Sequence, residues 1–216
     1  MPKRALIDNR PWLFAAIAAA LTYYFLSDNP IGELYLMLIK GAGVGFLAVY
    51  AFYRAPGFEG KVLALALALS AAGDMAIELW FEIGGAFFAV SHIVACVLYL
   101  RNRREATTTS QMLLGAALLI ATPAWSYVLS GDIYVALYAT ILGAMAATAW
   151  TSRFPRYRVG VGALLFIVSD WLIFSRMGAY DLAPLPDLFI WPLYFAGQLM
   201  IATGVVQTLR GEMPAK

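Results

Sequence analysis

Long stretches of apolar residues alternate with short polar breaks along the whole chain. Each stretch has about 17–25 residues, the length that an α-helix needs to cross the ~30 Å hydrocarbon core of a membrane. Backbone polar groups cannot stay unpaired in lipid, and the stretches are too long and continuous for barrel strands, so helices are predicted. Eight spans result, at residues 11–27, 31–53, 61–80, 84–100, 110–129, 133–151, 159–175 and 188–209.

The breaks between the spans carry turn or charge signals and no long linker. Among them are Asp28-Asn29-Pro30, Ala55-Pro56-Gly57, Gly84-Gly85, Gly131-Asp132 and Phe154-Pro155-Arg156. Residues 1–216 are therefore predicted to form one integral membrane domain, an all-α bundle of eight transmembrane helices.

Composition supports the same class of protein. Of the 216 residues, 62% are hydrophobic and only 13% are charged, whereas soluble domains carry about 25% charged residues. Most of the surface must therefore face lipid. The single cysteine, Cys96, excludes an internal disulfide and a cysteine metal cluster. The basic first ten residues lead into an apolar run without a small-residue cleavage site, so no removable signal peptide is predicted.

Lysine and arginine indicate the orientation of the chain. If both termini and the second, fourth and sixth breaks lie on one side, the other side holds only Arg176. The first side then holds Lys3, Arg4, Arg10, Arg54, Lys61, Arg101, Arg103, Arg104, Arg153, Arg156, Arg158, Arg210 and Lys216. Cytoplasmic loops carry such an excess of positive charge. Both termini are therefore predicted to be cytoplasmic, in the inner membrane if the host is bacterial. Because topology explains these charges, nucleic acid is not predicted as a partner.

Several polar residues fall inside the spans, where a charge at mid-bilayer costs at least about 2.5–3.5 kcal/mol on insertion scales. The ionisable ones are Lys40, Asp74, His92 and Asp170. Glu78 lies one turn after Asp74 on the same helix face, and the amide of Gln198 also lies deep. At ~1.5 Å per residue, the polar groups lie about 8–15 Å inside the non-cytoplasmic ends of their helices. We expect them to face one cavity in that half of the bundle.

Each of these residues also has a structural explanation. An aspartate can pair with Lys40 to hold two helices together, His92 can be a hydrogen-bonded core residue, and Gln198 can join two helices. Their shared depth favours a common functional site over separate structural roles.

Two halves of the chain show similar elements. Segments 70–74 and 166–170 both end in aspartate, in the third predicted helix of each half. The next helices contain segments 87–92 and 194–198, each with aromatic residues followed by a polar side chain. This similarity suggests a parallel internal repeat of four plus four spans.

The same elements resemble the YhhN family, the bacterial branch of the lysoplasmalogenase group of eight-span membrane proteins. The resemblance runs from about residue 30 to 205 and departs from the family where many members carry Lys-Pro and this chain has Lys40-Gly41. It implies hydrolysis of the vinyl ether bond of lysoplasmalogens, a class of lysophospholipid, to a fatty aldehyde and a glycerophospho-head-group. It also implies that the intramembrane aspartates are the catalytic pair. The motifs that carry it are the small–Gly–Asp element at Asp74, the aromatic run ending in His92, Ser169-Asp170, Tyr194…Gln198 and the Lys40 helix.

The residues themselves suit this chemistry. Cleavage of a vinyl ether begins with protonation of its β-carbon, and water then attacks the resulting oxocarbenium ion. One protonated carboxyl group and one carboxylate meet that need, as in glycosidases, and an apolar environment disfavours the charged form of a carboxyl group. The sequence leaves the assignment open, with a preference for Asp74 as the acid and Asp170 as the base.

Other residues would support the pair. Lys40 would contact the lipid phosphate or hold one carboxylate ionised, and His92 or Gln198 would orient water or share a proton. Glu78 and Tyr194 are further supporting candidates. Aromatic side chains would line a slot for the acyl chain; those proposed are Phe87, Phe88, Trp171 and Tyr194.

Two alternatives use the same residues. A zinc hydrolase needs three or four His, Cys or carboxylate ligands, whereas this chain has one histidine and one cysteine, the latter inside an apolar span. A site of Asp74, Asp170 and His92 is the combination considered, and no metal or cofactor is predicted. A proton- or cation-coupled transporter of small molecules or lipids would use these groups as a relay. Against a transporter, no span carries a strong Pro/Gly break midway.

The predicted orientation can be tested with reporter fusions. A reporter at Gly131 should read as non-cytoplasmic, whereas reporters at Arg54, within 101–104 and within 153–158 should read as cytoplasmic, because basic loops remain on that side. A cytoplasmic reading at Gly131 would contradict the eight-span arrangement.

Overall fold

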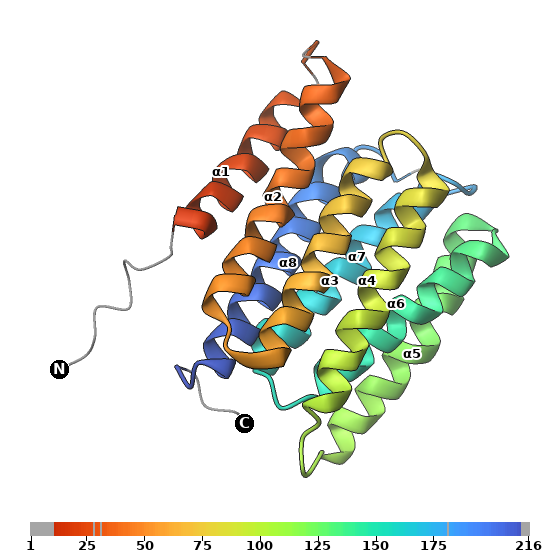
Figure 1. Ribbon diagram of the computed structural model, residues 1–216. Helices are drawn as coiled ribbons and strands as arrows, with labels where there is room; N and C mark the ends of the chain where they lie inside the picture. Colours follow the sequence, from red (N-terminus) through yellow and green to blue (C-terminus); the bar gives the residue numbers. More distant parts are fainter. Residues whose placement is uncertain (1–10, 28, 31, 181, 213–216) are drawn as a thin grey trace.

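The protein is a bundle of eight α-helices in the computed structural model, which describes residues 11–27, 29–30, 32–180 and 182–212 (Figure 1). A π-helical turn, η1 (Arg156–Gly160), leads directly into α7. The helices are α1 (Pro11–Leu26), α2 (Glu33–Arg54), α3 (Gly57–Ala76), α4 (Phe81–Arg101), α5 (Thr109–Ser130), α6 (Ile133–Thr151), α7 (Val161–Ser175) and α8 (Leu185–Leu209). The terminal basic residues of the charge count, Lys3, Arg4, Arg10 and Lys216, lie outside the described residues.

Within the described residues, six helical segments are long and apolar enough to cross a membrane. They are α2, α4, α5, α6, η1 together with α7, and α8. The prediction of an all-helical, multi-pass membrane protein is confirmed at this level. The other two helices, α1 and α3, are not among these candidate membrane spans, for different reasons. α1 has only 16 residues, and α3 has 20 residues but carries three charged side chains, Glu59, Lys61 and Asp74.

The third helix is displaced from its predicted position at 61–80. It begins at Gly57, directly after Pro56 in an extended conformation, and it ends at Ala76. The chain then turns, with two backbone N–H groups donating to the Ala76 carbonyl. The prediction placed the boundary at the first basic residue, although charged side chains in a first helical turn can reach the membrane surface. As a result, Asp74 lies in the last turn of its helix, closer to the helix end than the sequence suggested.

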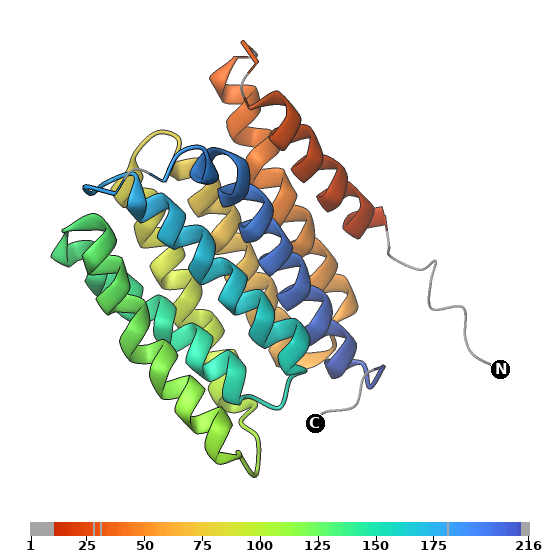
Figure 2. The ribbon, with the colours of Figure 1, turned by 180° about the vertical axis from the view of Figure 1, so that it is seen from behind.

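The helices form two layers with further helices at both edges (Figures 1 and 2). α2, α3 and α4 pack in sequence in one layer, and α8 lies behind α2 and α3, paired with α7. α1 covers the outer side of α2, and the α5–α6 hairpin packs against α4 and α7 at the opposite edge. Buried side chains such as Leu47, Leu67 and Phe166 fill the space between the layers.

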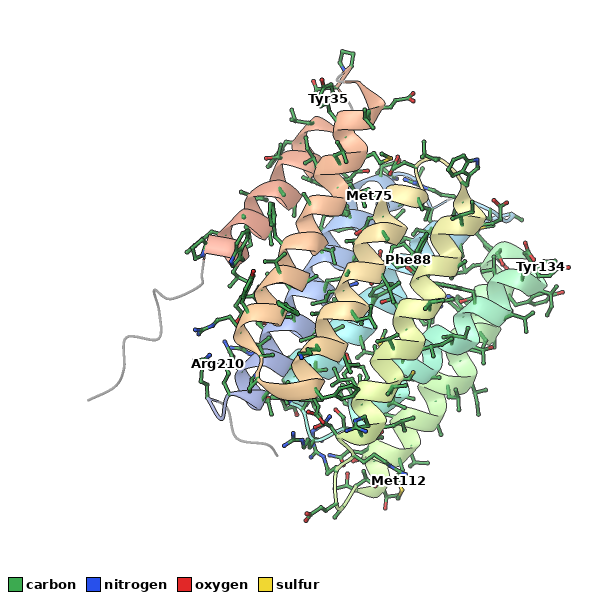
Figure 3. All side chains as sticks on the ribbon, viewed as in Figure 1. Tyr35, Met75, Phe88, Met112, Tyr134 and Arg210 are labelled. Atoms are coloured by element: carbon green, nitrogen blue, oxygen red, sulfur yellow. The ribbon has the colours of Figure 1, made fainter. Side chains whose placement is uncertain are left out.

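The α5–α6 hairpin is closed by local signals in the sequence. Gly131 ends α5 with φ 70°, a left-handed conformation that favours glycine. Asp132 then caps α6, because its Oδ1 accepts a hydrogen bond of 2.7 Å from the backbone N–H of Tyr134. Figure 3 shows Tyr134 at the upper end of the α5–α6 hairpin, at the right edge of the view.

α7 and α8 cross where two glycines face each other. A Cβ atom on Gly162 would lie 2.7 Å from the carbonyl oxygen of Gly197, and one on Gly197 would lie 2.6 Å from the oxygen of Gly162. The two backbones therefore touch, as small residues allow between membrane helices. This crossing holds α7, which carries Asp170, in register with α8, which carries Tyr194.

Replacement of Gly197 by alanine should lower the thermal unfolding temperature of the detergent-purified protein. Overpacking of this kind costs about 1–3 kcal/mol. Gly85→Ala is the matched control, because a Cβ at Gly85 would meet no atom within 4 Å and both variants gain the same helix propensity. Equal unfolding temperatures for the two variants would show that the close approach does not constrain the fold.

Candidate functional site

A cavity of about 540 Å³ lies among α2, α3, α4, α6, α7 and α8. Its size is in the range of protein sites for small molecules, roughly 300–1,000 Å³. Residues at the start of α4, at the start of α6 and just after α7 line it, so it extends to the end of the bundle that is predicted to be non-cytoplasmic. Most of its wall is apolar, formed by side chains that include Ile77, Phe88, Val135, Ile173, Phe174 and Trp191.

Asp74 lines this cavity from the last turn of α3 and is only 2% exposed. Its Oδ2 accepts a hydrogen bond of 2.7 Å from the hydroxyl group of Tyr194 on α8. The side chain of Gln198, one turn further along α8, lies beside the same hydroxyl group.

Asp170 lines the cavity from α7 and is 5% exposed. Its Oδ2 accepts a hydrogen bond of 2.8 Å from the hydroxyl of Tyr138 on α6. That hydroxyl also lies 3.2 Å from Nε2 of His92 on α4. When Tyr138 donates to Asp170, the second contact requires a proton on Nε2 of His92. The direction of the hydrogen bond between Tyr138 and Asp170 therefore determines the tautomer of His92.

Lys40 lines the cavity from α2 and pairs with Glu78 in the turn after α3. The hydroxyl of Tyr23 on α1 donates to the same carboxylate oxygen of Glu78 at 3.4 Å, and the Lys40 ammonium group lies 5.4 Å from the centre of the Tyr23 ring. Lys40 also interacts electrostatically with Asp74. One side of the cavity is therefore cationic, and α1 contributes to holding that charge.

Polar side chains continue behind the cavity wall. His92 and Gln198 both border a second space of about 20 Å³, together with Ser91 and Tyr99. Such a space is large enough for a single buried water molecule. The Tyr99 hydroxyl is buried and has no hydrogen-bond partner among the described residues. This second space therefore lies between the polar groups behind Asp170 and those behind Asp74.

The residues chosen from the sequence divide into two groups. Lys40, Asp74, Asp170 and Tyr194 line the same cavity. His92, Glu78 and Gln198 do not line it; each contacts a residue that does. Of the other proposed aromatic residues, Phe88 lines the cavity and Phe87 and Trp171 do not. The grouping differs from the expectation because depth along a helix does not specify which face of the helix points inward.

No group of three His, Cys, Asp or Glu side chains in the described part of the chain is arranged to hold a metal ion. Asp74, Asp170 and His92 therefore do not form the three-ligand site considered as an alternative.

Tyr138 and Trp191 are residues of the site that the sequence did not single out. Tyr138 contacts both Asp170 and His92, and Trp191 lines the cavity while its Nε1 donates to the carbonyl of Ala20 at 2.9 Å. Tyrosine and tryptophan near span ends usually indicate the membrane interface. Only the contacts of these side chains inside the bundle distinguish them from interfacial residues.

Comparisons with known proteins agree with the motif resemblance. Two curated proteins named lysoplasmalogenase, from Mycobacterium bovis and Mycobacterium tuberculosis, are each 30% identical to this chain over 89% of its length and 80% of theirs. No solved structure gives a significant match. The YhhN family matches residues 35–205, which include both aspartates and their tyrosine partners. The chain therefore belongs to the YhhN family.

Proposed function

We propose that this protein hydrolyses the vinyl ether bond of a lysoplasmalogen-type lysophospholipid to a fatty aldehyde and a glycerophospho-head-group. The observation that carries the proposal is that two buried aspartates, each bonded to a tyrosine, face one largely apolar cavity. The relatives named lysoplasmalogenase support the same reaction. An apolar cavity suits a lipid, and a pair of carboxyl groups suits acid–base cleavage of an enol ether.

The reaction can be written with aspartates and water alone. A protonated carboxyl group gives its proton to the β-carbon, which leaves an oxocarbenium ion and a carboxylate. The second carboxylate takes a proton from water as the water oxygen bonds to the α-carbon, which gives a hemiacetal. The hemiacetal C–O bond to glycerol then breaks. The second carboxyl group returns its proton to the leaving oxygen, and the first takes the hydroxyl proton, so both groups regain their starting forms.

The charges around the two aspartates differ. Lys40, Glu78 and Asp170 all interact electrostatically with Asp74; the cation stabilises its carboxylate, whereas the two acidic groups stabilise its protonated form. The groups that act on Asp170 are its apolar surroundings and Tyr138. When Asp170 gains a proton, the direction of the two hydrogen bonds can reverse. Asp170 then donates to the Tyr138 hydroxyl, and this hydroxyl donates to Nε2 of His92, because neutral histidine can accept or donate at Nε2.

The cavity has separate regions for the two ends of the lipid. Val135, Ile173 and Phe174 provide an apolar wall beside Asp170 for the acyl chain. Lys40 provides a cation for the phosphate, and binding there would require the phosphate to replace Glu78 as its partner. The proposal involves no metal or cofactor.

We also propose that all eight helices span the membrane, with both termini in the cytoplasm and the cavity open to the opposite side. The charges of Glu59 and Lys61 lie near the start of α3, where they would reach the headgroups. The 16 residues of α1 would extend about 24 Å at ~1.5 Å per residue, a length that local thinning of the bilayer accommodates. The inner-membrane location and the parallel four-plus-four repeat remain predictions.

Asp74→Asn and Asp170→Asn should each lower kcat for aldehyde release from a lysoplasmalogen by about 10²-fold or more, since general acid–base catalysis typically contributes 10²–10⁴. The purified protein should be active without added metal, and a chelator should leave the rate unchanged. Asp132→Asn is the control: Asp132 lines the same cavity, and asparagine is an equally good helix N-cap. Full activity in both Asp74→Asn and Asp170→Asn would remove the proposed mechanism.

Lys40→Ala should raise KM more than it lowers kcat, because a contact with the lipid phosphate is made equally in the ground state and the transition state. Glu78→Gln is the matched variant, since it removes the competing carboxylate and leaves the cation; its KM should be unchanged or lower. A lower kcat with unchanged KM in Lys40→Ala would show that the lysine acts on the charge of Asp74.

A further inference from the structure

Two loops meet at the end of the bundle opposite the cavity opening, the end that is predicted to be cytoplasmic. The loop after α4 and the loop after α6 pair at Arg103 and Ser152. The backbone N–H of Arg153 donates to the carbonyl of Asn102 at 2.8 Å, and its Nε donates to the Asn102 side-chain oxygen, also at 2.8 Å. Figure 1 shows both loops at the lower end of the bundle. These bonds hold the two loops together.

Five arginines lie on these loops and on the turn that follows. They form what we term the arginine cluster: Arg103, Arg104, Arg153, Arg156 and Arg158. Within the described residues, none of the five forms an ion pair with a carboxylate. Other arginines at this end do: Arg101 pairs with Glu59, and Arg54 and Arg210 both pair with Glu212. The positive charge of these five arginines is therefore not balanced by a carboxylate, although Arg153 donates to Asn102 and Arg158 donates to the side-chain oxygen of Gln207 at 2.9 Å.

Two members of the arginine cluster repel each other. The Nε and Nη2 atoms of Arg104 donate to the carbonyl of Ser152 at 3.3 and 3.1 Å, which fixes the guanidinium group against the second loop. Partial burial and the nearby Arg156 lower the pKa of Arg104. Like charges that are held close together by a fold are relieved when an anion binds between them.

The surface around the arginine cluster is suited to lipid. Tyr157, between two cluster arginines, is 77% exposed, and Met112 and Leu113 in the first turn of α5 are 52% and 66% exposed. Figure 3 labels Met112 at this end of the bundle. Exposed apolar side chains mark the lipid boundary here, and tyrosine is enriched at the headgroup level. An anion held by the cluster would therefore lie in the headgroup layer.

We propose that the arginine cluster binds the phosphate of an anionic phospholipid in the leaflet that faces it. Guanidinium groups bind phosphate through paired N–H donors, and basic pockets at the cytoplasmic ends of membrane helices accept such headgroups. The site is at the opposite end of the bundle from the cavity and does not depend on the proposed hydrolysis. A bound lipid would join the α4–α5 and α6–α7 loops and stabilise the bundle.

The test compares thermal unfolding of the full-length protein in nanodiscs of phosphatidylcholine alone and with phosphatidylglycerol. Phosphatidylglycerol should raise Tm by roughly 4 °C or more, and Arg156→Gln should lose most of that rise. Arg104→Gln should also lose most of the rise in Tm. Because this variant loses its hydrogen bonds to Ser152 as well, the comparison uses only the difference in Tm between the two nanodisc compositions. Arg101→Gln is the matched control, since it removes an equal charge from the same end but from an arginine paired with Glu59.

Arg101→Gln should keep the full phosphatidylglycerol effect. If phosphatidylglycerol raises the Tm of Arg156→Gln and Arg104→Gln as much as it raises that of the parent protein, the proposal is overturned. Inorganic phosphate, added to phosphatidylcholine nanodiscs, distinguishes the two sources of the anion. A small effect of phosphate on Tm supports a lipid ligand, whereas a rise equal to that from phosphatidylglycerol would overturn it in favour of a soluble anion.

Discussion

A carboxyl group inside an apolar helical bundle needs a hydrogen-bond partner from the protein, because lipid offers none. Asp74 and Asp170 each obtain one from a tyrosine on another helix. The site therefore depends on how α3 packs on α8 and how α6 packs on α7. A shift of either pair would leave a buried polar group unpaired, at a cost of about 1–3 kcal/mol. The glycine contact between α7 and α8 holds the two halves of this arrangement together.

The two aspartates are similar in burial but differ in their surroundings. Lys40 places a cation near Asp74, whereas Asp170 is connected through Tyr138 to a histidine behind the cavity wall. The proposed vinyl ether cleavage needs such a difference, because one group must start as a proton donor and the other as a carboxylate. Helix α1 also contributes, because Tyr23 donates a hydrogen bond to Glu78, the ion-pair partner of Lys40.

The ends of the bundle differ in charge, and a lipid is the proposed ligand at both. The cavity extends to one end, where the acidic residues Glu82 and Asp132 line it. The arginine cluster lies at the other end, beside exposed apolar side chains. The separation of charge from which the orientation is predicted thus agrees with the two proposals, a lysophospholipid substrate at the cavity and an anionic headgroup at the arginines.

The number of helices and the class of fold follow from sequence, because apolar stretches of membrane-crossing length leave the backbone little alternative to helix. Asp74 and Asp170 could also be chosen from the sequence, since a carboxyl group in an apolar span is costly and rarely without a role. The hydrogen-bond partners of these aspartates could not be chosen from the sequence. Tyr138 resembles any interfacial tyrosine in sequence, and His92 lies at a depth that fitted the cavity but on a face behind its wall. Likewise, the end of α3 at Ala76 and the charge difference between the aspartates depend on neighbouring helices. Helix rotation and packing decide which side chains meet, and hydrophobic periodicity is weak where every face of a helix is apolar, so only the tertiary structure determines the site.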